Sequence, residues 1–254
     1  MAASLTYVFC LVRSARRPNI NRVPLDLPGA RNLRALDAGA GEWLIVASVP
    51  ASRYDEAALA SGLQDIDWVG PRAMAHEGVV ERFLSAAAVL PMQLFTLFTS
   101  DDRALEHVGR ERRRIRRILD QIEGHHEWGL RLTWDEKAVR EQVEHKATKR
   151  APSGAAYLTR KRDLLAVNRA ELEAARDAAT RIFKGVSRLA ADANRRTSLE
   201  RATPGSRLLL DAAFLVPKRG GGKFRAAVRR LVKDMAGRGV TIALTGPWPP
   251  YNFI

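Results

Sequence analysis

The chain has a single cysteine, Cys10, among its 254 residues, so no intramolecular disulfide can form. This excludes a disulfide-stapled secreted module and fits a reducing cytosol. Residues 1–12 lack the basic start and the small-residue cleavage site of a signal peptide. The uncharged stretch 83–100 approaches the length of a membrane span, but Pro91 interrupts it. It therefore indicates a buried passage from helix to strand, and we expect no membrane partner.

Motifs that carry catalysis are also missing. The sequence has no GxSxG, no HExxH and no GxxxxGK[ST], since Phe224 follows the lysine after Gly220–Gly222. One cysteine cannot build a thiolate zinc site, and Cys10 is expected to be an inert strand residue. His76 falls beside an apolar helix stripe, where packing histidines are commoner than catalytic bases. The sequence predicts no enzyme, no catalytic residue, no cofactor and no metal.

Positive charge is abundant: Lys and Arg total 42 against 28 Asp and Glu, a net charge of +14. It gathers at 110–117, 137–162 and 217–238. Such a field favours acidic partners, among them nucleic acid and acidic proteins. Aromatic residues that could stack on bases make up only 7%, and no named nucleic-acid motif is present. Binding of nucleic acid by a basic module stays the alternative function, and the sequence predicts no specific nucleic acid as its partner.

Residues 1–134 alternate strands and helices. The expected strands are 5–12, 33–36, 42–49, 90–98 and 128–134, and the expected helices are 52–63, one that Pro71 opens at its first turn, and one from a Thr99 or Ser100 cap to Gly124. The segments 33–36 and 42–49 flank a turn and predict a hairpin. This order predicts a small α+β domain with a ferredoxin-like topology.

The second half begins after a charged joint at 135–154. Residues 155–196 predict a long helical segment, in which Leu158, Leu172 and Val186 share a heptad stripe. Packing on its own domain and a dimeric coiled coil are both open. A strand–helix–strand unit follows at 208–216, 223–236 and 240–244. The predicted fold is α+β with two small α+β domains, 1–134 and 135–244, and an extended C-terminal tail, 245–254.

The tail reads TGPWPPYNFI, and its three prolines oppose a regular helix or a central strand. Prolines stiffen an extended chain, which then loses little entropy when it docks. The tail also carries apolar side chains at Trp248, Tyr251, Phe253 and Ile254. These residues either pack in a groove of their own domain or present a partner-binding patch.

At this tail the chain resembles the gas vesicle GvpL/GvpF family. The segment TGPWPPYNFI is similar to the C-terminal signature of that family. Further landmarks agree in order: Tyr7, Ala73 with His76 and Val79, Val89–Pro91, Thr96 with Phe98, Glu127–Gly129, Tyr157–Leu158 and Ala212–Val216. Many relatives look like P-x-R-F-G-T-x-F where this chain has Pro91–Phe98. Gln93 replaces a basic residue of that pattern and Phe95 replaces a glycine. These departures indicate a different branch and put in doubt any partner contact that the arginine makes.

The resemblance implies an accessory protein for building gas vesicles, the gas-filled protein shells inside prokaryotic cells. It implies two α+β domains, the first ferredoxin-like, without catalysis or cofactor. It also implies binding to the small hydrophobic shell protein, and possible contacts with other accessory proteins, at the intracellular gas vesicle. We expect the contacts at Trp248, Pro249, Pro250, Tyr251 and Phe253, with the sheet edge of the first half as the other candidate surface.

Overall fold

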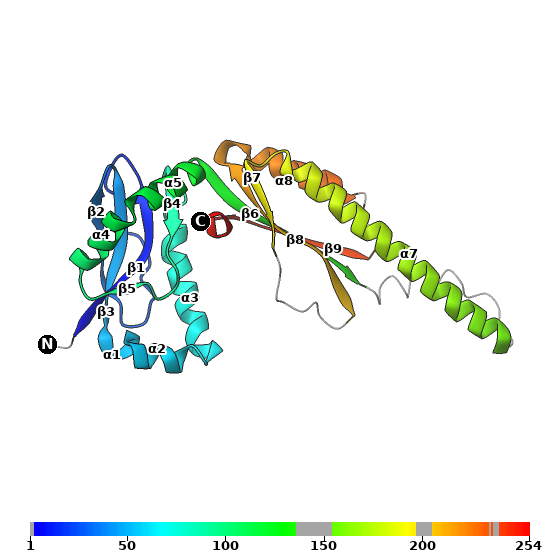
Figure 1. Cartoon of the computed structure of the whole chain (residues 1–254), viewed down its shortest axis with the longest axis horizontal. Helices are drawn as coiled ribbons and strands as arrows, with labels where there is room; N and C mark the ends of the chain where they lie inside the picture. The colour runs from blue at the N-terminus through cyan, green and yellow to red at the C-terminus, as the bar shows by residue number, and fades with distance from the viewer. Residues whose placement is uncertain (1–2, 136–153, 197–204, 234, 236–238) are drawn as a thin grey trace. The chain divides into compact units, whose positions relative to one another are not determined.

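The computed structural model describes residues 3–135, 154–196, 205–233, 235 and 239–254 (Figure 1). Contacts divide the chain into two compact units, one of residues 1–126 with 248–254 and one of residues 127–247. The sequence predicts boundaries after residues 134 and 244 instead. In the structure residues 127–134 group with the second unit, and the last seven residues group with the first.

The first unit is built on an antiparallel sheet with the order β2-β3-β1-β4, and β5 also pairs with β1. Its strands are β1 (Ser4–Arg13), β2 (Arg31–Gly39), β3 (Glu42–Pro50), β4 (Ala88–Pro91) and β5 (Leu97–Phe98). The predicted hairpin is confirmed as β2–β3. Seven consecutive residues of β1 are buried, which is typical of a strand covered on both faces.

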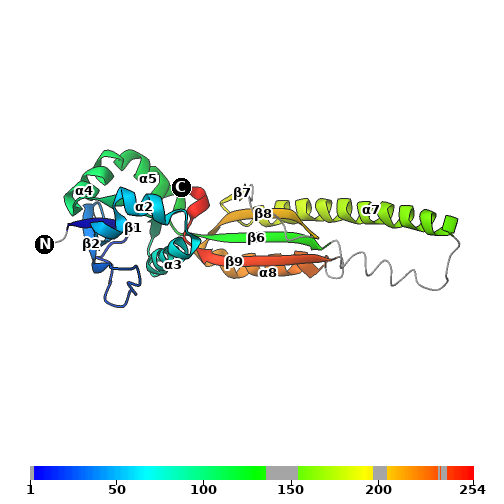
Figure 2. The same cartoon turned by 90° about the horizontal axis from the view of Figure 1, so that it is seen from below.

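Helices cover both faces of this sheet. They are α1 (Ala51–Tyr54), α2 (Glu56–Gly62), α3 (Ile66–Glu81), α4 (Asp101–Arg110) and α5 (Arg112–Ile122). Tyr7 and Phe9 share a core cluster with Val79 of α3. Val8 is as deeply buried but outside this cluster, because successive side chains of a strand alternate between its faces. Figure 2 shows α4 and α5 on the side of the sheet opposite α3.

Four expectations for this half are wrong in detail. The helix expected at 52–63 is two helices, α1 and α2, separated by the extended residue Asp55. Helix α3 begins five residues before Pro71, because the Asp65 carboxylate caps its start by accepting a hydrogen bond from the Asp67 N–H. The helix expected between Ser100 and Gly124 is two helices that meet at Glu111. The strand expected at 90–98 is interrupted, since residues 92–96 leave the sheet between β4 and β5. Of the two caps predicted for α4, Thr99 and Ser100, the structure has Ser100.

The second unit has a sheet with the order β7-β8-β6-β9. Its elements are β6 (His125–Asp135), α7 (Gly154–Ser187), β7 (Asp192–Arg195), β8 (Ser206–Pro217), η1 (Lys218–Gly220), α8 (Gly221–Lys233) and β9 (Val240–Trp248). Both helices pack in one core with alternate strand residues, Ile182 and Phe224 against Phe214. The opposite face carries the buried carboxylate of Asp211, which pairs with Arg131 and Arg196.

Helix α7 is shorter than the sequence predicts. It ends at Ser187, and residues 192–195 form β7 beside β8 instead of continuing the helix. From Leu172 to Val186 the heptad stripe is buried within its own unit. The side chains of Leu158 and Leu165 lie outside the described residues, and so does the joint at 136–153. Over its described length the stripe therefore packs intramolecularly.

The fold class is α+β, as predicted, but the ferredoxin-like topology of the first half is not confirmed. A ferredoxin-like domain follows the order βαββαβ. In the first unit residues 14–30 connect β1 to β2 by turns, without a helix. The described elements of the second unit do follow that order, from β6 through α7, β7, β8 and α8 to β9.

Candidate functional site

The predicted contact residues lie in the segment 248–254, which groups with the first unit. Pro249, Pro250 and Phe253 are buried, and Tyr251 is half-buried. The backbone forms a short 3₁₀ turn, Tyr251–Phe253, in which the Phe253 N–H donates to the Pro250 carbonyl at 3.2 Å. Of the five predicted residues, Trp248 is the exposed one, at 37%. The tail is therefore held against its own chain, with Trp248 at one end of the held segment.

Tyr251 is anchored to helix α3. Its hydroxyl donates a hydrogen bond to Oε2 of Glu77. Burial of the phenol raises the pKa of Tyr251, and the neighbouring Glu77 carboxylate raises it further. The phenol is therefore neutral at physiological pH and acts as a donor. Because hydrogen bonds to charged acceptors are stronger than neutral ones, this contact fixes the tail on α3.

Tyr7 of the sheet contacts His76, the residue before Glu77 in α3. The Tyr7 hydroxyl lies 2.8 Å from Nδ1 of His76 and accepts a hydrogen bond from the Phe95 N–H at 3.3 Å. Burial lowers the pKa of His76 to about 4, so its imidazole is neutral. Tyr7 then donates to Nδ1, which places the ring proton on Nε2. His76 packs among aromatic rings as the sequence predicts, but its Nε2 atom is buried without a hydrogen-bond partner among the described residues.

The connection between β4 and β5 contains the two residues that depart from the family pattern. Phe95 has a φ of 65°, a conformation that a bulky side chain rarely adopts and glycine adopts freely. Its ring packs 5.4 Å from that of Trp68 and 6.4 Å from that of Tyr54, between centroids. The glycine of the resembled pattern would suit this backbone, and in this chain aromatic packing holds Phe95 in its place.

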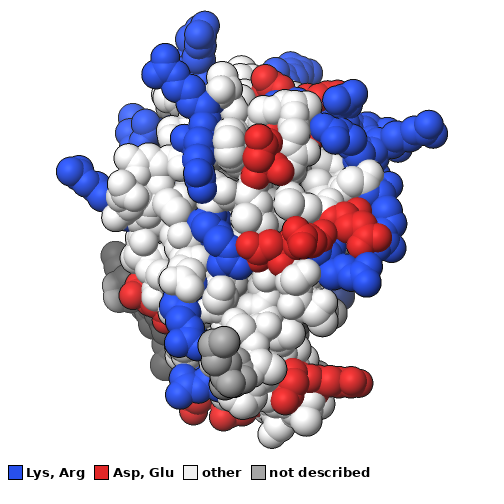
Figure 3. Space-filling view, turned by 90° about the vertical axis from the view of Figure 1, so that its left-hand side faces the viewer, with Lys and Arg blue, Asp and Glu red and all other residues white. Residues whose placement is uncertain are grey.

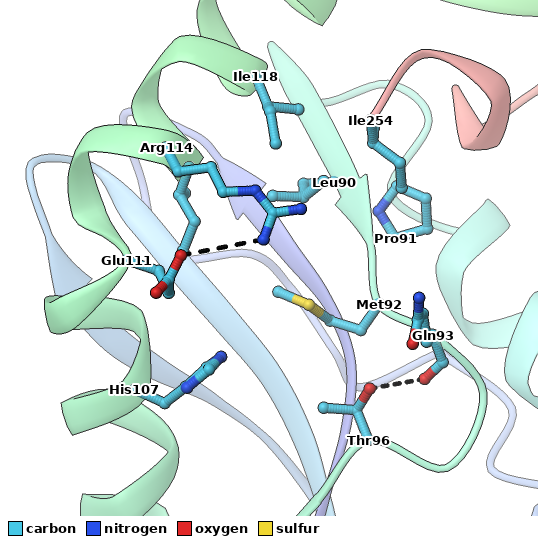
Figure 4. Close-up of a pocket in the computed structure, with 11 residues that line it drawn as sticks. Leu90, Pro91, Met92, Gln93, Thr96, His107, Glu111, Arg114, Ile118 and Ile254 are labelled. Carbon is cyan, nitrogen blue, oxygen red and sulfur yellow. Dashed lines mark hydrogen bonds and ion pairs between the residues drawn. The ribbon is translucent and has the colours of Figure 1, made fainter.

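Two hollows flank Ile254 on the first unit. One, of about 410 Å³, lies between Glu77 of α3 and Tyr251 of the tail. The other, of about 310 Å³, lies between α5 and β4 (Figure 4). Both are lined by Pro91, Met92, Gln93 and Ile254. Ile254 is 45% exposed, so it offers an apolar side chain next to two concave surfaces. The predicted departure at Gln93 therefore lies in the wall shared by both hollows.

The basic segment 110–117 also falls in the first unit, across the end of α4 and the start of α5. Part of the segment 217–238 forms α8, with exposed cations at Lys223, Arg225, Arg229, Arg230 and Lys233. The segment 137–162 lies mostly outside the described residues. The basic segments 110–117 and 217–238 therefore belong to different units.

Metal binding, membrane spanning and thiol chemistry find little support in the part of the chain that is described. No group of three or more His, Cys, Asp or Glu side chains there could hold a metal ion. None of the described helices is long and apolar enough to cross a membrane. Cys10 is fully buried, and burial raises the pKa of its thiol, which disfavours the reactive thiolate.

The family model described as gas vesicle synthesis protein GvpL/GvpF matches residues 5–254. The chain belongs to this family. It is 32% identical over 215 residues to gas vesicle protein L of a Streptomyces species, covering 82% of this chain and 78% of that protein. It is 30% identical over 210 residues to gas vesicle protein L2 of Halobacterium salinarum, covering 74% and 72%. The GvpL/GvpF family is one of gas vesicle proteins and is not known as an enzyme family.

Solved structures of GvpF share this fold. GvpF from Anabaena sp. PCC7120 aligns with a TM-score of 0.69 at 14% identity, covering 98% of this chain and 95% of that one. GvpF from Microcystis aeruginosa aligns with a TM-score of 0.65 at 12% identity, covering 99% and 98%. At these identities the likeness concerns the fold. The family match and the shared fold together are consistent with a role in gas vesicle assembly.

Proposed function

We propose that this chain binds the hydrophobic shell protein of gas vesicles, as an assembly factor or as a minor component of the vesicle. Contacts with other accessory proteins would occur at the same intracellular structure. The observation that carries the proposal is the anchored tail, which exposes Trp248 and Ile254 at the two ends of a buried segment. An exposed apolar pair on a fixed backbone suits an apolar partner, because little conformational entropy is lost on binding.

The five predicted residues then have two roles. Trp248 would contact the partner directly, together with Ile254. Pro249, Pro250, Tyr251 and Phe253 would hold the contact surface in place, since three of them are buried and Tyr251 is bonded to Glu77. A tryptophan is among the side chains that most often dominate binding energy at protein interfaces. We therefore expect Trp248 to contribute more than any other single residue of the tail.

A pull-down of co-expressed shell protein tests this function. The tagged full chain is treated with nuclease and washed at about 0.5 M salt, where the screening length is only a few Å and charge-only complexes weaken. We expect shell protein to be retained, and the Trp248→Ala/Ile254→Ser variant to retain at least about fivefold less. Leu189→Ser is the matched control, because Leu189 is an exposed leucine at 42% in the other unit.

Absence of shell protein from the washed full-length chain would contradict the proposal. The alternative, a nucleic-acid-binding module, predicts the opposite salt response, since each phosphate contact releases counterions and affinity falls steeply with salt. If the tail variant and the Leu189→Ser control lose equal amounts of retained shell protein, the tail is not part of the contact surface. Shell-protein binding by the chain is then still supported.

A further inference from the structure

The hollow between α5 and β4 has an apolar floor. Leu90 and Met92 line it from β4 and the residue after it, and Ile115 and Ile118 line it from α5. Figure 4 shows the Met92 side chain extending into the space between the helix and the connection. Its volume of about 310 Å³ is at the lower end of the range for pockets that hold small apolar groups. The floor can therefore receive an aliphatic or aromatic side chain.

The rim of this hollow contains Arg114 and Glu111, and helix α5, which forms that rim, is strongly basic. Helix α5 carries five arginines against one aspartate, and all five are exposed. Arg114 lines the hollow, and its ion pair with Glu111 is long, at 3.9 Å. Arg117 follows three residues later and so lies on the same side of the helix. Arg117 forms no ion pair with any described residue.

Charges of both signs lie on the end of the first unit. Figure 3 shows lysine and arginine side chains projecting from the margins of this face, with acidic side chains among the uncharged ones across its middle. A nucleic acid would use the arginines and leave the apolar floor uncovered, whereas a neutral apolar peptide would use the floor and leave the arginines unpaired. An amphipathic acidic segment matches both the arginines and the apolar floor, because its carboxylates meet the rim while an apolar side chain fills the hollow.

We propose that the hollow between α5 and β4 binds an apolar side chain from an acidic segment of a protein partner, with Arg114 and Arg117 facing the carboxylates of that segment. The inference rests on the proposed function, in which the partner is the shell protein, and it adds the partner chemistry and a second contact beside the tail. Exposed ion pairs of this kind act mainly on encounter and weaken with salt, whereas the apolar contact persists.

The chain offers a matched pair of variants for the test. Arg114→Gln/Arg117→Gln removes one charge that lines the hollow and a second charge three residues later on the same helix. Arg112→Gln/Arg116→Gln removes two exposed charges from the same helix, on positions that face another side. Gln93→Trp fills the hollow from an exposed residue in its wall without opening the core. Circular dichroism and thermal unfolding of each full-length variant show that it folds like the parent chain.

The readout is shell protein retained by each tagged variant, at about 0.05 M and about 0.5 M salt. We expect Arg114→Gln/Arg117→Gln to reduce retention by at least about fivefold at low salt and by less at high salt. We expect Gln93→Trp to reduce it by a similar factor at both salts, and the Arg112→Gln/Arg116→Gln control to stay within about twofold of the parent.

The outcomes separate the two proposals. If the parent chain retains shell protein and both arginine variants behave alike, the hollow is not the site, and the proposed function stands. If the parent chain retains none, the proposed function fails and this inference fails with it. A photo-crosslinker at Gln93 that captures a second copy of this chain or nucleic acid, and no acidic segment of the shell protein, would also overturn the inference.

Discussion

The Tyr251 hydroxyl donates a hydrogen bond to the Glu77 carboxylate, although 174 positions separate the two residues along the chain. This contact joins the last turn of the described chain to the middle of helix α3. It defines where the last seven residues of the family signature lie, on the first unit and next to two hollows. The first prediction concerns this contact.

Replacing Tyr251 by phenylalanine keeps the ring and removes the donor. We expect the tail to detach more often, with a loss of about 1.5–3 kcal/mol from its local opening free energy, the usual contribution of a hydrogen bond to a charged group. Hydrogen exchange of the amides of residues 251–254 measures this loss. Trp248→Ala is the control, because it removes an exposed side chain and leaves the anchor intact. Unchanged exchange in Tyr251→Phe would show that burial alone holds the tail.

The second prediction concerns the left-handed backbone at Phe95. Phe95→Ala keeps the strain and loses the packing on Trp68 and Tyr54, whereas Phe95→Gly loses the packing and relieves the strain. We therefore expect the glycine variant to be more stable than the alanine variant by about 1 kcal/mol, with the parent chain above both. Urea unfolding of the three proteins gives the order. An alanine variant more stable than the glycine variant would contradict the strained backbone.

Gly246 gives a third prediction, because its φ is 116° and an added Cβ would lie 2.8 Å from the Glu127 carbonyl oxygen. Gly246→Ala must shift backbone on both strands, and we expect it to lower the free energy of unfolding by at least about 2 kcal/mol. Gly78→Ala is the matched control. Gly78 lies inside helix α3 with nothing within 4 Å of an added Cβ, so the same substitution there should stabilise by about 0.5–1 kcal/mol. Differential scanning calorimetry compares the two variants.

The fourth prediction is a dependence of stability on pH through His76. The pKa of His76 is about 4 in the folded chain, below the ordinary value of 6.5, because the ring is buried. Between these values the unfolded chain binds more protons, so stability is complete above pH 6.5 and falls as the pH is lowered toward 4, by up to about 3 kcal/mol. Unfolding midpoints measured from pH 7 to pH 4 should show this fall.

His76→Gln should make that dependence shallower, whatever its effect on stability at pH 7. The control is His107→Gln, since His107 is exposed on α4. A parent chain and a His76→Gln variant with equal slopes would show that another group carries the dependence.

Local signals in the sequence predicted the elements that depend on neighbouring residues. The apolar run at 5–12, the turn between β2 and β3 and the Ser100 cap each act over a few residues, and the structure confirms all three. The family signature in the tail led to the family, because the order and spacing of its residues are specific. The start of α3 predicted from Pro71 was wrong, because the Asp65 cap defines that start and the proline is accommodated within the helix.

The sequence by itself determined the α+β class, the run of buried strands and the membership of the GvpL/GvpF family, because hydrophobic period and motif order are properties of the linear chain. Only the tertiary structure decided where the tail docks and which residues meet it. Tyr251 and Glu77, or Gln93 and Ile254, come together through packing between distant segments, and no local pattern encodes that pairing. The same applies to the hollow beside α5, since its apolar floor and charged rim come from segments that meet only in the fold.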